Sequence, residues 1–196
     1  MQNHSNTDTC QCKLKDEEVR FHMPGEHPGE LGREFLNKVC FFLHGGFGFN
    51  VYQTSYEGED AASVIAENEV VKFDIMMYQR RKRTLGNQRM EEYRVHFICE
   101  CKWRSDPRDL KGKLREFLSK ALKTVQSLQR RFSNNYYFMF ICNKSFGVSQ
   151  ENLQDVGFIR KFLDEEIDSR NLQILSDKVG ILILPDWFLD AAAMGS

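Results

Sequence analysis

The stretch Phe97-Ile98-Cys99-Glu100-Cys101-Lys102-Trp103, which follows Tyr93-Arg94-Val95-His96, is apolar and β-branched enough to predict a strand. Side chains alternate along a strand, so Glu100 and Lys102 are expected on one face, and the aromatic and cysteine side chains of the stretch on the other. A carboxylate and an ammonium are costly to bury unless they serve each other or a ligand. Taken alone, the pair also fits a surface salt bridge on a half-exposed strand.

A second apolar run, residues 70–78, carries Asp74 in its middle, where strand propensity disfavours an acid. The basic, glycine-containing segment 79–89 joins the two runs and predicts a hairpin between them. Pairing the runs would bring Asp74 close to Glu100 and Lys102. Two carboxylates and a lysine at one place predict a site for a hard divalent cation with a charged helper. Without that cation, the two carboxylates should repel each other.

An Asp on one strand followed by Glu-x-Lys on the next resembles the PD-(D/E)xK nuclease superfamily, which includes many restriction endonucleases, Holliday-junction resolvases and Mrr-like enzymes. The resemblance covers roughly residues 30–143. It implies a core of a helix, a three-stranded meander, a helix and a further strand, and metal-dependent hydrolysis of nucleic acid. Asp74, Glu100 and the backbone carbonyl of Cys101 would bind Mg²⁺ or Mn²⁺. Lys102 would orient or help deprotonate the attacking water, or stabilise the pentacovalent phosphate.

A first helix is predicted from residue 28 or 29 to residue 44, stopped by Gly45-Gly46. Its apolar stripe is Leu31, Phe35, Val39, Phe42 and Leu43. In the superfamily this helix often supplies an acid, which would here be Glu34, holding a second metal ion or a water. Mrr-type relatives carry that acid just after the Phe, where this chain has Leu36, so the choice between Glu34 and Glu30 stays open. The alternative is an ordinary solvated glutamate.

Two segments concentrate positive charge. The hairpin tip is expected to carry Arg80, Arg81, Lys82, Arg83 and Arg89, either as a phosphate-tracking finger or as a turn kept soluble by charge. A helix over residues 108–131 is strongly basic, with a core stripe of Leu114, Leu118, Ala121, Leu122, Val125 and Leu128. The resemblance implies that a polar residue of this helix lies close to the active site. Lys120, Lys123 and Gln126 are the candidates; the alternative is that these side chains form the helix's wet face.

The remaining pattern completes an α/β fold, a mixed central β-sheet of about five strands flanked by helices on both faces, with a restriction-endonuclease-like core. The helix between the Glu-x-Lys strand and the apolar run 135–143 predicts a parallel pairing of those two strands. The other expected elements are a strand at 47–56, a helical turn at 61–66, a helix at 158–168 and a strand at 179–184.

Composition sets the outer limits. The chain has 196 residues, 41% hydrophobic and 28% charged, which suits one globular domain. We expect a loose lead-in over residues 1–27 that includes a short strand at 19–22, a nuclease-like domain over 28–190, and a tail over 191–196. Net charge is −1, which excludes a chain that is basic throughout but not a local basic face.

Cellular location and cysteine use are predicted from the same composition. No run is long enough to span a membrane and no signal peptide is visible, so we expect an intracellular protein with reduced cysteines. Cys10 and Cys12, near His4 and His22, could form half of a zinc site, although their spacing is tight and no matching pair follows.

The function expected from these observations is a Mg²⁺- or Mn²⁺-dependent nuclease acting on nucleic acid, in the first instance DNA. The alternatives are a nuclease-like fold that only binds nucleic acid or protein, and an α/β protein-binding module in which Glu100 and Lys102 form a plain ion pair. A nucleotide-binding domain is disfavoured because the chain has no Gly-x-x-x-x-Gly-Lys and no Gly-x-Gly-x-x-Gly. A homodimer, and further domains in a longer chain, remain compatible with the sequence.

Overall fold

The computed structural model describes residues 28–47, 50–53, 63–66, 69–85, 88–128 and 136–194. The expected lead-in, the strand at 19–22 and the cysteine and histidine pairs of the zinc hypothesis lie outside these residues. Within them, no helix is long and apolar enough to cross a membrane.

The centre of the molecule is a five-stranded sheet in the order β1-β4-β5-β6-β7. Its strands are β1 Asn50–Gln53, β4 Ile75–Leu85, β5 Gln88–Lys102, β6 Tyr137–Cys142 and β7 Val179–Ile183. β5, β6 and β7 run parallel to one another, while β4 is antiparallel to β5 and β1 is antiparallel to β4. The expected parallel pairing between the Glu-x-Lys strand and the next apolar strand is confirmed, with the crossover made by a helix.

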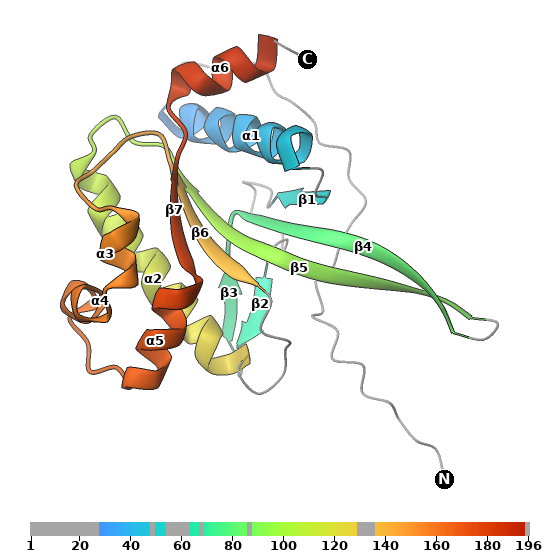
Figure 1. The fold of residues 1–196 in the computed structure, drawn as a ribbon. Coiled ribbons are helices and arrows are strands. Elements are labelled where there is room, and N and C mark those ends of the chain that lie inside the picture. Colours follow the sequence, from blue (N-terminus) through green and yellow to red (C-terminus); the bar gives the residue numbers. More distant parts are fainter. Residues whose placement is uncertain are drawn as a thin grey trace.

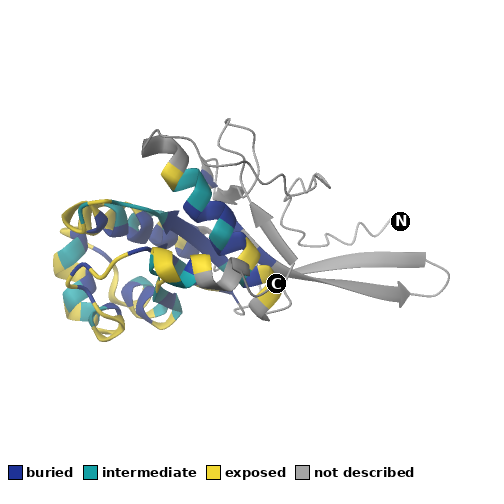
Figure 2. Cartoon of the chain, turned by 90° about the horizontal axis from the view of Figure 1, so that it is seen from above, coloured by how far each residue is buried: buried dark blue, intermediate teal, exposed yellow. Residues whose placement is uncertain are grey.

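Helices cover both faces of the three parallel strands, which confirms an α/β fold (Figure 1). One face is covered by α1 Pro28–Phe47 and α6 Asp186–Met194. The other is covered by α2 Arg108–Leu128, α3 Gln150–Gln154, α4 Val156–Leu163 and α5 Ser169–Lys178. The buried residues form two clusters, one on each side of the sheet. Figure 2 shows these buried positions along the sheet and the inward helix faces, with the exposed positions on the outer turns.

The free edge of β7 is occupied by a side chain. Gln150 accepts a hydrogen bond from the N–H of Ile181 at 3.0 Å and donates one to the carbonyl of Val179 at 3.0 Å. A carboxamide places N–H donors beside an acceptor oxygen, so it can bond to a strand edge much as a peptide group does. It therefore satisfies two backbone groups that an edge strand otherwise offers to another strand.

Several predicted elements differ in the structure. α1 continues through Gly45-Gly46 to Phe47, since a glycine inside a helix costs only about 1 kcal/mol relative to alanine. Residues 63–66 form a strand, β2, where a helical turn was expected, because the β-branched pair Val64-Ile65 favours extended backbone. The helix expected at 158–168 ends at Leu163 and is followed by α5, which was not predicted. The expected tail contributes residues 191–194 to α6.

The run 70–78 is not one strand. Residues Glu69–Lys72 form β3, which pairs with β2 Ser63–Ala66 in a separate two-stranded antiparallel sheet, and the chain bends at Phe73 and Asp74 before β4 begins. Asp74 therefore lies at a bend between two sheets, not inside a strand. This position removes the conflict between an acid and strand propensity.

The segment expected as the hairpin connection is mostly strand. β4 continues to Leu85 and β5 begins at Gln88, so residues 80–83 lie within β4 and not at the tip of the hairpin. The expectation of a basic tip is thus corrected to a basic strand.

Candidate active site

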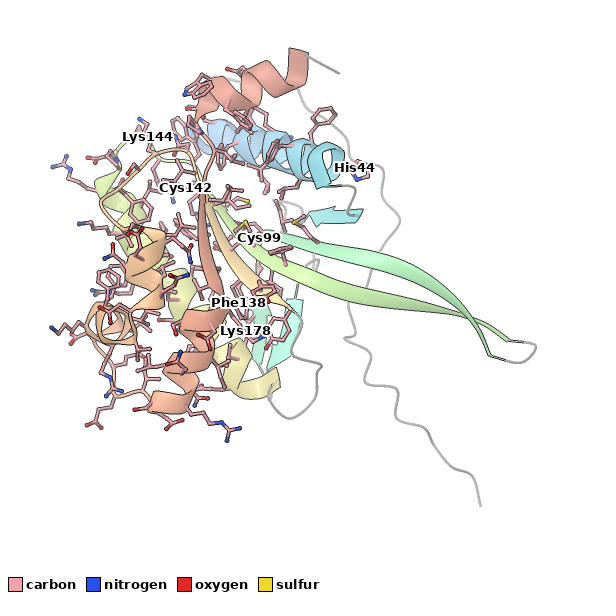
Figure 3. All side chains as sticks on the ribbon, in the orientation of Figure 1. His44, Cys99, Phe138, Cys142, Lys144 and Lys178 are labelled. Carbon is pink, nitrogen blue, oxygen red and sulfur yellow. The ribbon has the colours of Figure 1, made fainter. Side chains whose placement is uncertain are left out.

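Alternation along β5 separates the side chains of the motif strand. Ile98 belongs to the buried cluster on the α2 side, whereas Cys99 and Cys101 belong to the cluster on the α1 side. Figure 3 labels Cys99 on the part of the sheet beneath α1. Glu100 and Lys102, which have the parity of Ile98, therefore project toward α2, and the ion pair of Glu100 with Lys120 of that helix agrees with this.

Asp74 lies directly before Ile75, the residue at which β4 begins to pair with β5. Its N–H donates to the carbonyl of Cys99 at 3.1 Å, and its Oδ2 accepts from the N–H of Cys101 at 2.8 Å. The carboxylate thus takes the place that a further strand residue would have occupied. In an antiparallel pair the N–H and the carbonyl of one residue point to the same edge, so the carbonyl of Cys101 also faces the edge on which Asp74 lies.

Lys102 joins the two acids. Its Nζ lies 2.9 Å from Asp74 Oδ2 and 2.8 Å from Glu100 Oε1. The two carboxylate oxygens are therefore no further apart than the sum of those distances, and one ammonium contacts both of them. Burial lowers the pKa of Lys102, but the charges and hydrogen bonds of the two acids outweigh burial and the pKa is raised overall. An ammonium thus lies where the sequence predicts a divalent cation, so the expected repulsion between the acids is offset by lysine.

α2 contributes a second ammonium. Lys120 Nζ donates to the same oxygen, Glu100 Oε1, at 2.9 Å, and lies 5.9 Å from the centre of the Phe73 ring. Of the three helix residues considered from the sequence, this one makes the contact, while Lys123 and Gln126 have exposed side chains. The rotation of α2 about its own axis decides which of the three side chains reaches Glu100, and sequence spacing alone does not predict that rotation.

Glu116 was not identified from the sequence. It lies one helical turn before Lys120 and pairs with Lys113 at 2.8 Å. The hydrogen bond from Lys113 lowers the pKa of Glu116, burial opposes this, and the charges of Lys102 and Lys120 lower it further. An i, i+4 relation to Lys120 was the available signal for a third acid on the rim of this site.

The second oxygen of Glu100 is the least satisfied atom of the group. Glu100 is 5% exposed, and its Oε2 is buried without a hydrogen-bond partner. A buried carboxylate oxygen without a partner carries a desolvation cost that a bound water or cation would remove. Among the described residues, no group of three or more His, Cys, Asp and Glu side chains could hold a metal ion. The donors that fit Mg²⁺ are two carboxylates and a carbonyl, and Mg²⁺ commonly keeps several waters.

Glu34 lies in a different environment. It pairs with Lys38 at 2.9 Å, and Lys38 also bonds Asp190 of α6. Among the contacts that the structure describes, Glu34 makes none to Asp74, Glu100 or Lys102. α1 packs on the opposite face of the sheet from Glu100, which explains this separation. The side chain of Glu30, the other candidate, is outside the described side chains.

The predicted phosphate-binding residues lie on a paired strand. The register places Arg81 opposite Glu92 and Lys82 opposite Glu91, and Arg80 and Arg83 opposite uncharged residues. The side chains of these basic residues are outside the described ones. Opposite charges facing each other across an antiparallel pair stabilise it, so pairing accounts for part of the charge in this segment.

No family model, no curated protein and no solved structure matches the chain.

Proposed function

We propose that the protein is a metal-dependent nuclease with a PD-(D/E)xK-like core that hydrolyses phosphodiester bonds, in the first instance those of DNA. The observation that carries the proposal is the junction of β4, β5 and α2. There, Asp74 and Glu100 approach the same ammonium while Glu100 Oε2 has no partner. A buried, incompletely satisfied carboxylate beside a second carboxylate is the donor set that a hard cation prefers.

The residues that would hold Mg²⁺ or Mn²⁺ are Asp74 and Glu100, with the carbonyl of Cys101. When bound, the metal ion supplies a water of lowered pKa and neutralises charge on the phosphate. Lys102 donates hydrogen bonds to two carboxylates in the structure, which is the behaviour of an ammonium. Its role is therefore to donate toward the attacking water or a phosphate oxygen, and not to abstract a proton. Lys120 fixes the orientation of Glu100.

The competing function is a nuclease-like fold that binds without cleaving. It is favoured by the same ammonium, because Lys102 already pairs with both acids in the absence of metal. A plain protein-binding module would share this arrangement but would bind neither metal nor nucleic acid.

The test is cleavage of labelled duplex DNA, single-stranded DNA and RNA with Mg²⁺ or Mn²⁺. Lys102→Ala should lower the cleavage rate by about 10²–10³-fold, the usual cost of losing one stabilising donor. Lys161→Ala, at an exposed lysine of α4, is the control for charge loss and should cleave at the wild-type rate. Absence of cleavage of all three substrates, with Mn²⁺ still binding, would favour the non-cleaving alternative.

A further inference from the structure

Beyond the main sheet, β4 and β5 continue as a two-stranded ribbon, here called the arm, formed by residues 79–85 and 88–94. Its register is continuous from Gln79 opposite Arg94 to Leu85 opposite Gln88. β1 pairs only with residues 75–78 of β4, and β6 only with residues 97–102 of β5. Both outer edges of the arm are thus without a strand neighbour among the described residues, and Figure 1 shows the arm extending away from the helices.

A β-bulge marks the base of the arm. Met77 pairs with Phe97 and Tyr78 with Val95, so His96 is an extra residue on β5. A bulge bends its strand and increases the local twist. The bulge lies beside Tyr78, the last residue of β4 that pairs with β1, and directly before Phe97, the first residue of β5 that pairs with β6, so the arm leaves the main sheet at a defined place.

The arm is far more basic than the rest of the chain. Residues 79–94 contain six basic and two acidic residues, whereas the whole chain has a net charge of −1. The remainder of the protein is therefore acidic overall. Solubility alone does not require such a separation of charge, and a local basic surface attracts a polyanion.

Both faces of the arm share this charge. Residues directly opposite each other in an antiparallel pair lie on the same face. One face has three basic residues and one acid, namely Arg80, Lys82, Arg89 and Glu91. The other has the same balance, namely Arg81, Arg83, Arg94 and Glu92. Neither face has the apolar stripe that a ribbon needs to pack on a protein core.

We propose that the arm enters the major groove of duplex DNA. Duplex DNA would then be the substrate class of the active site, a conclusion that rests on the proposed function. A two-stranded ribbon fits that groove, which is about 12 Å wide in B-form DNA. Phosphates line both of its walls, and the arm presents positive charge on both faces. Seven residues per strand give a ribbon about 24 Å long. The deep, narrow major groove of A-form RNA would not admit it.

The test measures binding without divalent metal, so that cleavage does not interfere. Arg81→Gln/Arg83→Gln removes charge from one face, and Arg80→Gln/Lys82→Gln removes it from the other. Lys161→Gln/Arg170→Gln, at exposed positions on α4 and α5, is the matched control. Fluorescence anisotropy over a salt series would be recorded with duplex DNA, duplex RNA, single-stranded DNA and a duplex carrying bulky substituents at pyrimidine C5, which project into the major groove.

We expect the wild type to bind duplex DNA most tightly and the C5-substituted duplex more weakly. Each arm variant should reduce the salt slope for duplex DNA by about 1–2, since each lost phosphate contact lowers it by about 0.9. The control should leave the slope unchanged. Unchanged slopes in both arm variants, equal binding of duplex RNA, or undiminished binding of the substituted duplex would overturn the inference. Thermal melting of each variant checks that it is folded.

The two proposals fail separately. Duplex binding that depends on the arm but is never followed by cleavage would sink the nuclease proposal and leave the arm as a DNA-binding element. Metal-dependent cleavage by arm variants whose DNA binding equals that of the wild type would overturn the arm proposal and support the nuclease proposal.

Discussion

Replacing Lys102 by methionine removes the ammonium that pairs both acids while keeping a side chain of similar length. Lys102 Nζ lies 2.9 Å from Asp74 and 2.8 Å from Glu100, and the side chains of Lys102 and Glu100 are 18% and 6% exposed. Removing one partner of a buried ion pair costs about 3–5 kcal/mol. Because Lys120 still pairs with Glu100, the free energy of unfolding without metal should fall by about 3 kcal/mol, the lower end of that range.

Lys120→Met is the matched control. It removes an ammonium from the same oxygen of Glu100, but the Lys120 side chain is 36% exposed and Lys102 remains. Solvent screening limits the expected loss to about 1 kcal/mol. Urea unfolding at neutral pH gives both values. Equal losses in the two variants would show that Lys102 is not the principal counter-ion of the acids.

Measuring Mn²⁺ binding distinguishes a metal site from an ion-pair group that only stabilises the fold. If Mn²⁺ takes the place of the ammonium, Lys102→Met should bind Mn²⁺ more tightly than the wild type, because no resident cation competes. Free Mn²⁺ at 100 times its dissociation constant should restore about 2.7 kcal/mol of stability. Tighter binding of Mn²⁺ by the wild type, measured by calorimetry, would refute the reasoning.

Three further predictions address other parts of the chain. Asp74→Asn should lower the unfolding free energy without metal by about 1–3 kcal/mol, since it removes the negative charge that pairs with the Lys102 ammonium, and urea unfolding in a chelator would measure this. Burial, aided by the charge of Asp74, raises the pKa of Cys40 to about 12. The free energy of unfolding should therefore fall by about 1.4 kcal/mol per pH unit between pH 9 and 12, because the unfolded chain loses this thiol proton and the folded chain keeps it. Cys40→Ala should flatten that slope when unfolding is measured at several pH values. Gln150→Ala should expose the edge of β7 and produce concentration-dependent association in sedimentation, whereas a strictly monomeric variant would show that the carboxamide is not needed to block that edge.

The sequence predicts the parts of the fold that follow from local periodicity. The alternation around Glu100 and the crossover helix after Lys102 are sufficient to predict the motif strand, its faces and its parallel neighbour. The bend at Asp74 is not visible in this way, because apolar residues continue on both sides of it and only the tertiary structure assigns them to two sheets.

The same reasoning applies to the candidate site. Glu34 sits beside the apolar stripe of its helix, but the stripe does not reveal which face of the sheet the helix will cover. Lys120 depends on the rotation of α2 about its axis. The sequence predicts that Asp74, Glu100 and Lys102 lie close together, but Lys102 was expected to act on a water, and its bonds to both acids depend on side-chain geometry that the sequence does not give.

The bulge at His96 makes the relation between the arm and the body sensitive to chain length. A β-bulge adds one unpaired residue to one strand, bends that strand and increases its local twist. Deleting His96 would restore an unbroken ladder at Met77 and Tyr78, in which each arm residue keeps its partner, and would remove the bend that the bulge introduces. Loss of one residue at this position would therefore change the direction of the arm without altering any residue of the candidate site. Related chains could in this way differ in the ligand that the arm binds while keeping the same acids and lysines.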